Sequence, residues 1–198
     1  MKNRKRNRLM GYDYSRDNLY FVTKCVKGML CCLGEIIPGA GTGRVRPGRV
    51  RTGRVRTGRD LSVRNKFLPD PSFPNSDQIM VLNQYGKIVE EKLLWLEEQY
   101  PYAVLHNFVV MPNHLHAIIE IDSARVKDKS IKIKSLSSLF GAFGTTSSKM
   151  IHQSGFLDFA WHRSFHDHII KNDKSYCNIS NYIDNNPSNW NLDKFFSR

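Results

Sequence analysis

The sequence lacks any long hydrophobic run, and this absence argues against a membrane-spanning protein. No stretch of the 198 residues approaches the roughly 18 consecutive apolar residues that a membrane-spanning helix needs, and the mean hydropathy is −0.45. The basic start of the chain, MKNRKRNRLM, leads into GYDY instead of the hydrophobic core of a signal peptide. We therefore expect a cytoplasmic protein without a membrane partner.

Cysteine is also scarce. The chain has four irregularly spaced cysteines with no C-x-x-C pair among them, namely Cys25, Cys31, Cys32 and Cys177. This pattern argues against a disulfide framework of the kind that small secreted proteins use. We interpret the four side chains as small apolar residues in a reducing compartment.

Acidic residues are in short supply too. The chain has 18 aspartates and glutamates against 30 lysines and arginines, which gives a net charge of +12 and an isoelectric point near 9.7. A positive charge of this size favours a polyanionic partner, and nucleic acid is the first candidate. Hydrophobic residues still make up 40% of the chain, which is enough for a packed core.

Part of the positive charge lies in one glycine-rich repeat at residues 43–59. The segment reads GRVRPGRVRTGRVRTGR, with a five-residue period, seven arginines and no acidic residue. Because it has no large apolar side chain, we predict that residues 38–77 form a disordered insertion. One interpretation is a passive linker. The other is an arm that binds backbone phosphates through arginines such as Arg44, Arg46, Arg49, Arg51, Arg54 and Arg56.

Hydrophobic periodicity outside the insertion predicts an α+β fold. Strands are expected over 20–26, 103–111 and 114–121, the last two joined by a tight connection at Pro112-Asn113. Helices are expected over about 77–100, from 136 towards 151, and over about 174–186, where Pro187 ends the last one. This order predicts an antiparallel sheet with helices packed on one face. We expect a single domain over residues 12–198, after a basic tail at residues 1–11.

His114 and His116 are the first candidates for a chemical role. Side chains two apart on a strand share a face, so these two histidines point the same way. The alternate residues form an apolar face that can receive the helices, namely Leu115, Ala117, Ile119 and Ile121. Two imidazoles on one strand face can chelate a divalent metal. The alternative is a pair of solvated or hydrogen-bonded histidines.

Tyr182 and Asn186 form a second candidate pair. They are four residues apart in a predicted helix, which places them one turn apart on the same face. Asn186 offers a carbonyl oxygen, a hard ligand that suits Mg²⁺ or Mn²⁺. Tyr182 offers a phenol, which becomes a nucleophile once it loses its proton. The alternative is that Tyr182 packs in the core with its hydroxyl at the edge.

Three segments resemble the single-tyrosine HUH transposases, in particular the REP-associated tyrosine transposase branch of the insertion-sequence-200-like superfamily. They read VVMPNHLHAIIEI, WHRSFHDHII at 161–170 and NYIDNNPSNW at 181–190, and HUH denotes the His-hydrophobic-His triplet at 114–116. YFVTKCVKG followed by CLGEI resembles the opening hairpin of the family, and LNQYGKIVEE resembles the start of its first helix. The resemblance covers residues 12–36 and 78–198.

The resemblance implies a fold, a reaction and a set of residues. The implied fold is a ferredoxin-like domain that commonly forms homodimers. Tyr182 matches the nucleophile of the family, and His114, His116 and Asn186 match the ligands of a divalent metal, Mg²⁺ or Mn²⁺. Such transposases cut single-stranded DNA beside a hairpin or palindromic repeat through a 5′-phosphotyrosine intermediate, and a second transfer rejoins the DNA. The implied location is the cytoplasm, with DNA-bound protein on the nucleoid.

Further DNA contacts are expected from basic residues outside the repeat, namely Lys149, Arg163 and Lys171. The sequence departs from the family pattern at Gly144, where a basic residue is usual, and at His162, where glutamine is usual. Both departures concern contacts with DNA more than the chemistry.

Other functions have to be weighed against a transposase. A catalytically idle relative would keep the fold and only bind DNA hairpins, but the presence of all four site residues together favours the enzyme. A zinc-dependent hydrolase would need a carboxylate base beside the histidines, and none is evident. His162, His166 and His168 also suggest a zinc site, although we favour hydrogen-bonded, partly buried histidines there.

Overall fold

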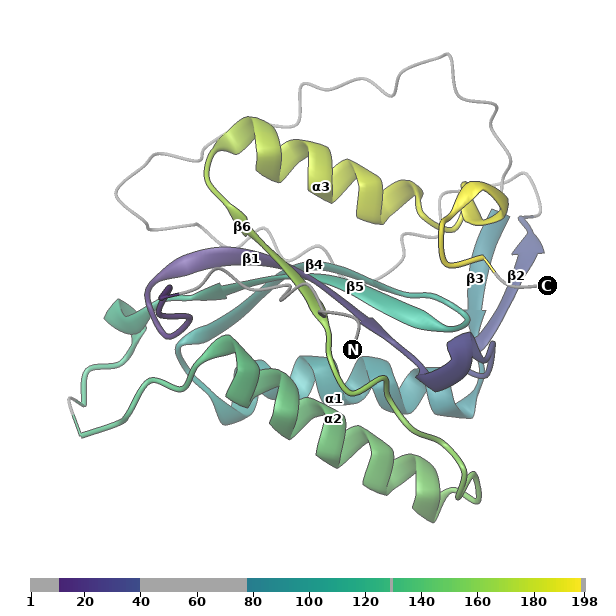
Figure 1. The fold of residues 1–198 in the computed structure, drawn as a ribbon, viewed down its shortest axis with the longest axis horizontal. Coiled ribbons are helices and arrows are strands. Elements are labelled where there is room, and N and C mark those ends of the chain that lie inside the picture. The colour runs from purple at the N-terminus through teal and green to yellow at the C-terminus, as the bar shows by residue number, and fades with distance from the viewer. Residues whose placement is uncertain (1–10, 40–77, 129, 197–198) are drawn as a thin grey trace, which may run out of the picture.

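The structure, a computed structural model, describes residues 11–39, 78–128 and 130–196 (Figure 1). The regular elements in this part of the chain are β1 (Asn18–Cys25), β2 (Gly34–Pro38), β3 (Gln78–Leu82), α1 (Gln84–Gln99), β4 (Ala103–Val110), β5 (His114–Ile121), α2 (Leu136–Gln153), β6 (His166–Ile170) and α3 (Asp173–Asn185). Residues 1–10 of the expected basic tail and residues 40–77 of the expected insertion, with all of its arginines, lie outside the described residues. None of the described helices is long and apolar enough to cross a membrane.

Four strands form one antiparallel sheet in the order β4-β5-β1-β6. Together with α1 and α2 they make two interleaved strand-helix-strand units, which is the ferredoxin-like arrangement. The α+β fold and the antiparallel pairing of 103–111 with 114–121 are therefore confirmed. In the register of the sheet, Cys25 lies opposite His114 and Thr23 lies opposite His116, so β1 forms one wall beside both histidines.

The two faces of the sheet carry different residues. Leu115, Ala117, Ile119 and Ile121 point into the larger core, where α1 and α2 cover them, as the alternation predicts. The third helix, α3, lies on the opposite face (Figure 1). A smaller apolar cluster holds it there, made of Val109, Met111, Ile118, Ile170, Ile183 and Trp190. Helices thus cover both faces, because Ile118 gives the histidine face an apolar patch that α3 buries.

The first helix begins later than its hydrophobic stripe suggests. It starts at Gln84, because the side chain of Asn83 accepts hydrogen bonds from the backbone N–H groups of Tyr85 and Gly86 and so caps it. Residues 78–82 instead form β3. Gly86 is required where it stands, since a Cβ there would collide with the backbone oxygen of Leu33.

The expected hairpin at the start of the chain does not form. β1 pairs with β5 and β6, whereas β2 pairs with β3 in a separate two-stranded ribbon. Pro38, at the end of β2, lies opposite Gln78, at the start of β3. The predicted insertion therefore connects two strands that pair with each other.

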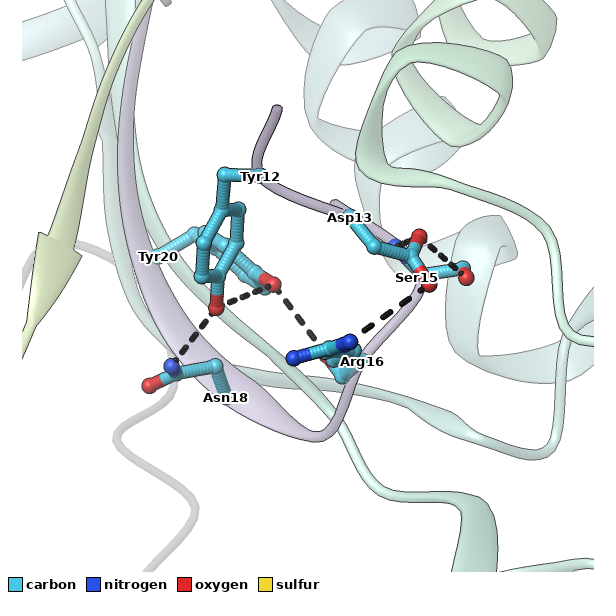
Figure 2. A network of polar contacts seen from close by, with 6 residues as sticks. All are labelled: Tyr12, Asp13, Ser15, Arg16, Asn18 and Tyr20. Atoms are coloured by element: carbon cyan, nitrogen blue, oxygen red, sulfur yellow. Dashed lines mark hydrogen bonds and ion pairs between the residues drawn. The ribbon is translucent and has the colours of Figure 1, made fainter. Parts of the chain in front are cut away.

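A polar network anchors the chain just before β1 (Figure 2). The buried Tyr20 donates its hydroxyl hydrogen to the backbone oxygen of Arg16 at 3.1 Å, and Asn18 donates to the hydroxyl of Tyr12 at 2.9 Å. Asp13 accepts from the hydroxyl of Ser15 at 2.6 Å. These contacts tie residues 12–18 to the first strand of the sheet.

Candidate active site

The two histidines of β5 face each other inside the protein. His114 is 0% exposed and His116 is 1% exposed, and their Nε2 atoms are 3.0 Å apart. Both lie on the α3 side of the sheet, as the strand alternation predicts. Their burial excludes solvated histidines, whereas the alternative of hydrogen-bonded histidines agrees with the distance between the two rings.

Neighbouring side chains determine how the two rings are oriented. Nδ1 of His114 lies 2.8 Å from Oδ1 of Asn113, whose amide nitrogen donates to the backbone oxygens of Met29 and Phe195. Since that oxygen can only accept, Nδ1 of His114 carries the hydrogen and Nε2 keeps its lone pair. Nδ1 of His116 lies 2.8 Å from the hydroxyl of Thr23. Partners of this kind at Nδ1 are typical of metal-ligating histidines.

Burial keeps both imidazoles neutral. Loss of solvation lowers the pKa of His114 to about 4, against which the nearby Asp193 acts in the opposite direction. Loss of solvation also holds the pKa of His116 well below its ordinary value, with a further contribution from His114. At neutral pH both rings therefore have the protonation state that metal coordination requires.

Helix α3 brings Tyr182 to the histidines. The hydroxyl of Tyr182 lies 3.2 Å from Nε2 of His116, and the ring centroids are 5.1 Å apart. The side chain is not a core residue, since 41% of it is exposed. Tyr182 is thus partly open to solvent, and its hydroxyl lies beside the histidine pair.

Asn186 follows the last turn of α3 and is 2% exposed. Its amide nitrogen donates to Oδ2 of Asp193 at 2.8 Å. Its carbonyl oxygen is buried and has no hydrogen-bond partner among the described residues. A buried oxygen without a partner is unusual in proteins and is consistent with a place for a cation or a water molecule.

Asp193 belongs to the same cluster, although the sequence analysis did not identify it. Its carboxylate accepts from the hydroxyl of Tyr182 at 3.3 Å and from the backbone N–H of Phe195 at 2.7 Å. The ligand atoms of His114, His116 and Asp193 all lie within 4.8 Å of one another. The expectation that no carboxylate accompanies the histidines is therefore wrong. Asp193 reaches the site because the chain turns back after Pro187, through the 3₁₀ turn at Trp190–Leu192.

The environment of Tyr182 keeps its phenol protonated. Burial, followed by the charge of Asp193 and its hydrogen bond, raises the pKa of Tyr182 to about 12, and Asn186 acts in the opposite direction. A nucleophilic Tyr182 thus needs a proton acceptor. The carboxylate oxygen Oδ2 of Asp193, 3.3 Å from the hydroxyl, is positioned to accept the proton.

Polar contacts also fix α3 on the sheet around Tyr182. The buried side chain of Asn107, at an irregularity in β4, donates to the hydroxyl of Ser180 at 2.8 Å and to Oδ1 of Asp184 at 2.9 Å. Ser180 and Asp184 lie two residues before and two residues after Tyr182. Asn107 therefore sets the position of this turn of the helix.

The other basic residues singled out from the sequence do not converge on this site. Lys149 is exposed on α2, which covers the opposite face of the sheet, and Arg163 is exposed ahead of β6. Lys171 follows the end of β6 that pairs with Leu19, away from Thr23. All three remain predictions as DNA contacts.

The additional histidines do not form a second metal site in the part of the chain that the structure describes. His162, His166 and His168 are exposed, so the expectation of partly buried side chains is wrong. The one grouping of at least three His, Cys, Asp or Glu ligand atoms found in that part is His114, His116 and Asp193.

Comparisons with known proteins relate the chain both to a protein of similar sequence and to solved structures of similar fold. No protein-family model matches the chain. A curated but uncharacterized protein from Haemophilus influenzae (strain Rd) is 27% identical over 203 residues, which cover 96% of this chain and 91% of the relative. A solved REP-associated tyrosine transposase, bound to a REP hairpin, has a TM-score of 0.51 and 16% identity over 96% of this chain and 76% of its own. This likeness shows that the two proteins share a fold.

Proposed function

We propose that the chain is a metal-dependent enzyme of the REP-associated tyrosine transposase kind, which cuts single-stranded DNA beside a hairpin or palindromic repeat and rejoins it. One geometric relationship carries the proposal. The hydroxyl of Tyr182 lies 3.2 Å from Nε2 of His116, which lies 3.0 Å from Nε2 of His114. A partly exposed tyrosine whose phenol lies beside two neutral imidazoles is suited to covalent phosphoryl transfer. The shared fold with a transposase that binds a REP hairpin supports the choice of DNA as substrate.

The residues at this site suit a divalent cation. The two Nε2 atoms point toward each other, and the buried carbonyl oxygen of Asn186 has no other partner among the described residues. His114, His116 and Asn186 would hold the ion, and the carboxylate of Asp193 is a further ligand atom within reach. One amide oxygen, two imidazoles and no thiolate favour Mg²⁺ or Mn²⁺ over Zn²⁺. When bound, the ion would act as a Lewis acid toward the scissile phosphate.

The protein itself supplies the nucleophile and moves the proton. Tyr182 loses its proton to Asp193, and its oxygen forms a bond to phosphorus while the bond from phosphorus to the 3′ oxygen breaks. The leaving 3′ oxygen takes up one proton through water, and Asp193 returns the proton it accepted to that water, so the products are a 5′-phosphotyrosine and a free 3′-hydroxyl. Because the new ester retains the energy of the broken phosphodiester, the rejoining step needs no ATP.

The test is a covalent adduct on a labelled hairpin oligonucleotide. With Mn²⁺ present, the full chain should give a DNA adduct that resists denaturation, and Tyr182→Phe should give none. Tyr176→Phe is the matched control, because Tyr176 lies on the same helix with its hydroxyl 3.4 Å from Nδ1 of His106. A normal adduct yield in Tyr182→Phe would exclude Tyr182 as the nucleophile. Hairpin binding by the full chain without any adduct would identify it as a catalytically idle DNA-binding relative.

A further inference from the structure

Lys24 is a buried lysine on the face of the sheet opposite the candidate active site. It lies in β1 between Val22 and Val26 of the larger core, and only 5% of it is exposed. The side chains of a strand alternate, so its neighbour Thr23 points the other way, toward His116. The proposed chemistry does not use Lys24.

The ammonium group of Lys24 has few partners. Its Nζ lies 3.4 Å from the backbone oxygen of His162 and 5.7 Å from the centroid of the Trp161 ring. Among the described residues, no carboxylate forms an ion pair with it. Burial lowers the pKa of Lys24 to about 8, so the group is still mostly charged at neutral pH. A buried cation without a counter-ion is costly, and one long contact to a carbonyl leaves two of its three N–H donors without a partner.

The ammonium group of Lys24 lies beside Gly144 of α2. A Cβ at Gly144 in α2 would lie 3.4 Å from Cε of Lys24 and 3.8 Å from its Nζ. The end of the lysine therefore rests against α2 at a position that has no side chain. Gly144 and Trp161 are half-buried, and the adjoining Thr145 and His162 are exposed.

We propose that Lys24, which lies beside Gly144 and Trp161, binds a phosphate group of the DNA substrate. This inference rests on the proposed function, which supplies the DNA. A phosphate would provide the missing negative charge and acceptor oxygens for the free N–H donors. Contacts of this type hold a nucleic acid in place without reading its sequence.

The location separates this contact from the cleavage chemistry. In the register of the sheet, Lys24 lies opposite Leu115, between the pairs that Thr23 and Cys25 make with His116 and His114. The lysine and the histidines thus use opposite faces of the same two strands. The phosphate at Lys24 belongs to a part of the DNA away from the scissile bond, so Lys24 contributes to affinity and not to the chemical step.

Lys24→Met tests the proposal, because methionine keeps the length of the side chain and removes its charge. The variant should bind a hairpin oligonucleotide about tenfold more weakly. Its plot of log affinity against log salt should flatten by roughly 0.7 to 0.9, the value for one lost phosphate contact. Cleavage at saturating DNA should be unchanged. Lys27→Met, at an exposed lysine three residues further on, is the control and should change affinity less.

Thermal unfolding distinguishes binding from a purely structural role. Removing a buried unpaired charge should leave the melting temperature of Lys24→Met unchanged or raise it. A lower melting temperature with wild-type affinity and salt slope would overturn the proposal and assign Lys24 to the core. A second experiment compares the melting temperature in inorganic phosphate with that in chloride at equal ionic strength. If phosphate raises the melting temperature of the wild-type chain but not of Lys24→Met, while both bind DNA equally well, Lys24 binds free phosphate. That result would also overturn the proposal.

Two different results distinguish a wrong Lys24 site from a wrong proposed function. If the wild-type chain forms its Tyr182 adduct while Lys24→Met binds hairpin DNA normally, only the Lys24 site is wrong. If the wild-type chain binds no hairpin DNA, both this site and the proposed function are wrong.

Discussion

The side-chain amide of Asn186 donates to the carboxylate of Asp193 at 2.8 Å and leaves its own carbonyl oxygen buried without a partner in the described part of the chain. The same carboxylate accepts from the hydroxyl of Tyr182. Asp193 thus fixes the orientation of the Asn186 amide, and it offers an acceptor for the phenolic proton. This arrangement gives Asp193 a testable role.

We expect Asp193→Asn to slow adduct formation by about 100-fold or more, because loss of a positioned proton acceptor typically costs that much. Hairpin affinity should change little, since the proposed chemistry and the contacts that position DNA are separate. Single-turnover rates at saturating DNA measure the effect. Asp158→Asn, at an exposed carboxylate, is the control and should behave like the wild-type chain. An unchanged rate in Asp193→Asn would remove Asp193 from the reaction.

The histidine pair predicts how metal binding depends on pH. Protons compete with a metal for a histidine only below its pKa, which burial lowers to about 4 for His114 and well below the ordinary value for His116. Mn²⁺ affinity measured by calorimetry should therefore stay nearly constant from pH 8 down to about 5 and fall below about 4. An exposed histidine pair would already lose affinity below about pH 6.5.

His114→Ala and His116→Ala should each abolish Mn²⁺ binding and cleavage while leaving hairpin binding largely intact. EDTA should stop cleavage by the wild-type chain, and added Mg²⁺ or Mn²⁺ should restore it. His168→Ala, at an exposed histidine on β6, is the matched control. Full activity in chelator would contradict the metal site.

Asn107 should matter for catalysis without touching the reacting atoms. Asn107→Ala removes the hydrogen bonds to Ser180 and Asp184, so the turn that carries Tyr182 loses its fixed position. We expect a loss of about 1–3 kcal/mol in stability, because buried polar partners are left unsatisfied. The single-turnover rate should fall at least tenfold, because a small displacement of the Tyr182 hydroxyl from its position for attack has an effect of that size. The affinity for Mn²⁺ should be unchanged.

Asn185→Ala is the control for that measurement. Asn185 lies on the same helix and donates to the backbone oxygen of Asn181 at 2.8 Å, but this contact is exposed. Its removal should change stability by less than about 0.5 kcal/mol, as is usual for surface positions. Equal rate losses in both variants would show that Asn107 has no special positioning role.

The ends of the insertion allow a clean deletion. Because Pro38 lies opposite Gln78, a two-residue Asn-Gly turn can replace the segment between β2 and β3. We expect fold, cleavage and hairpin affinity to remain unchanged, since a disordered arm must lose conformational entropy in order to bind. The salt dependence of affinity is the measurement. A slope that flattens by roughly 0.7 per lost contact would show instead that the arginines bind phosphates.

Local periodicity accounts for much that the sequence reveals here. A strand repeats every two residues, so His114 and His116 had to share a face, and the apolar residues between them had to form the other. A helix brings residues four apart together, so Tyr182 and Asn186 had to lie one turn apart. These rules involve only neighbours in the chain, and they hold whatever the rest of the molecule does.

Contacts between segments that are distant in the sequence do not follow from local periodicity. The carboxylate of Asp193 lies beyond Pro187, where no period relates it to Tyr182, and only the turn at Trp190–Leu192 returns it to the site. Similarly, β2 pairs with β3 and not with β1, because β1 already has β5 and β6 on its two edges. Competition for sheet edges depends on the whole fold and is not encoded in a local pattern.

By itself, the sequence determined the α+β class, the shared face of the two histidines and the spacing of the tyrosine and asparagine, since backbone geometry converts residue spacing into direction. Only the tertiary structure decided that α3 covers the histidine face, that Asp193 joins the cluster and that Lys24 is buried with no ion pair to any of the described residues. Those three outcomes depend on how separate elements pack, and packing is determined by the combined surface of all the elements that meet.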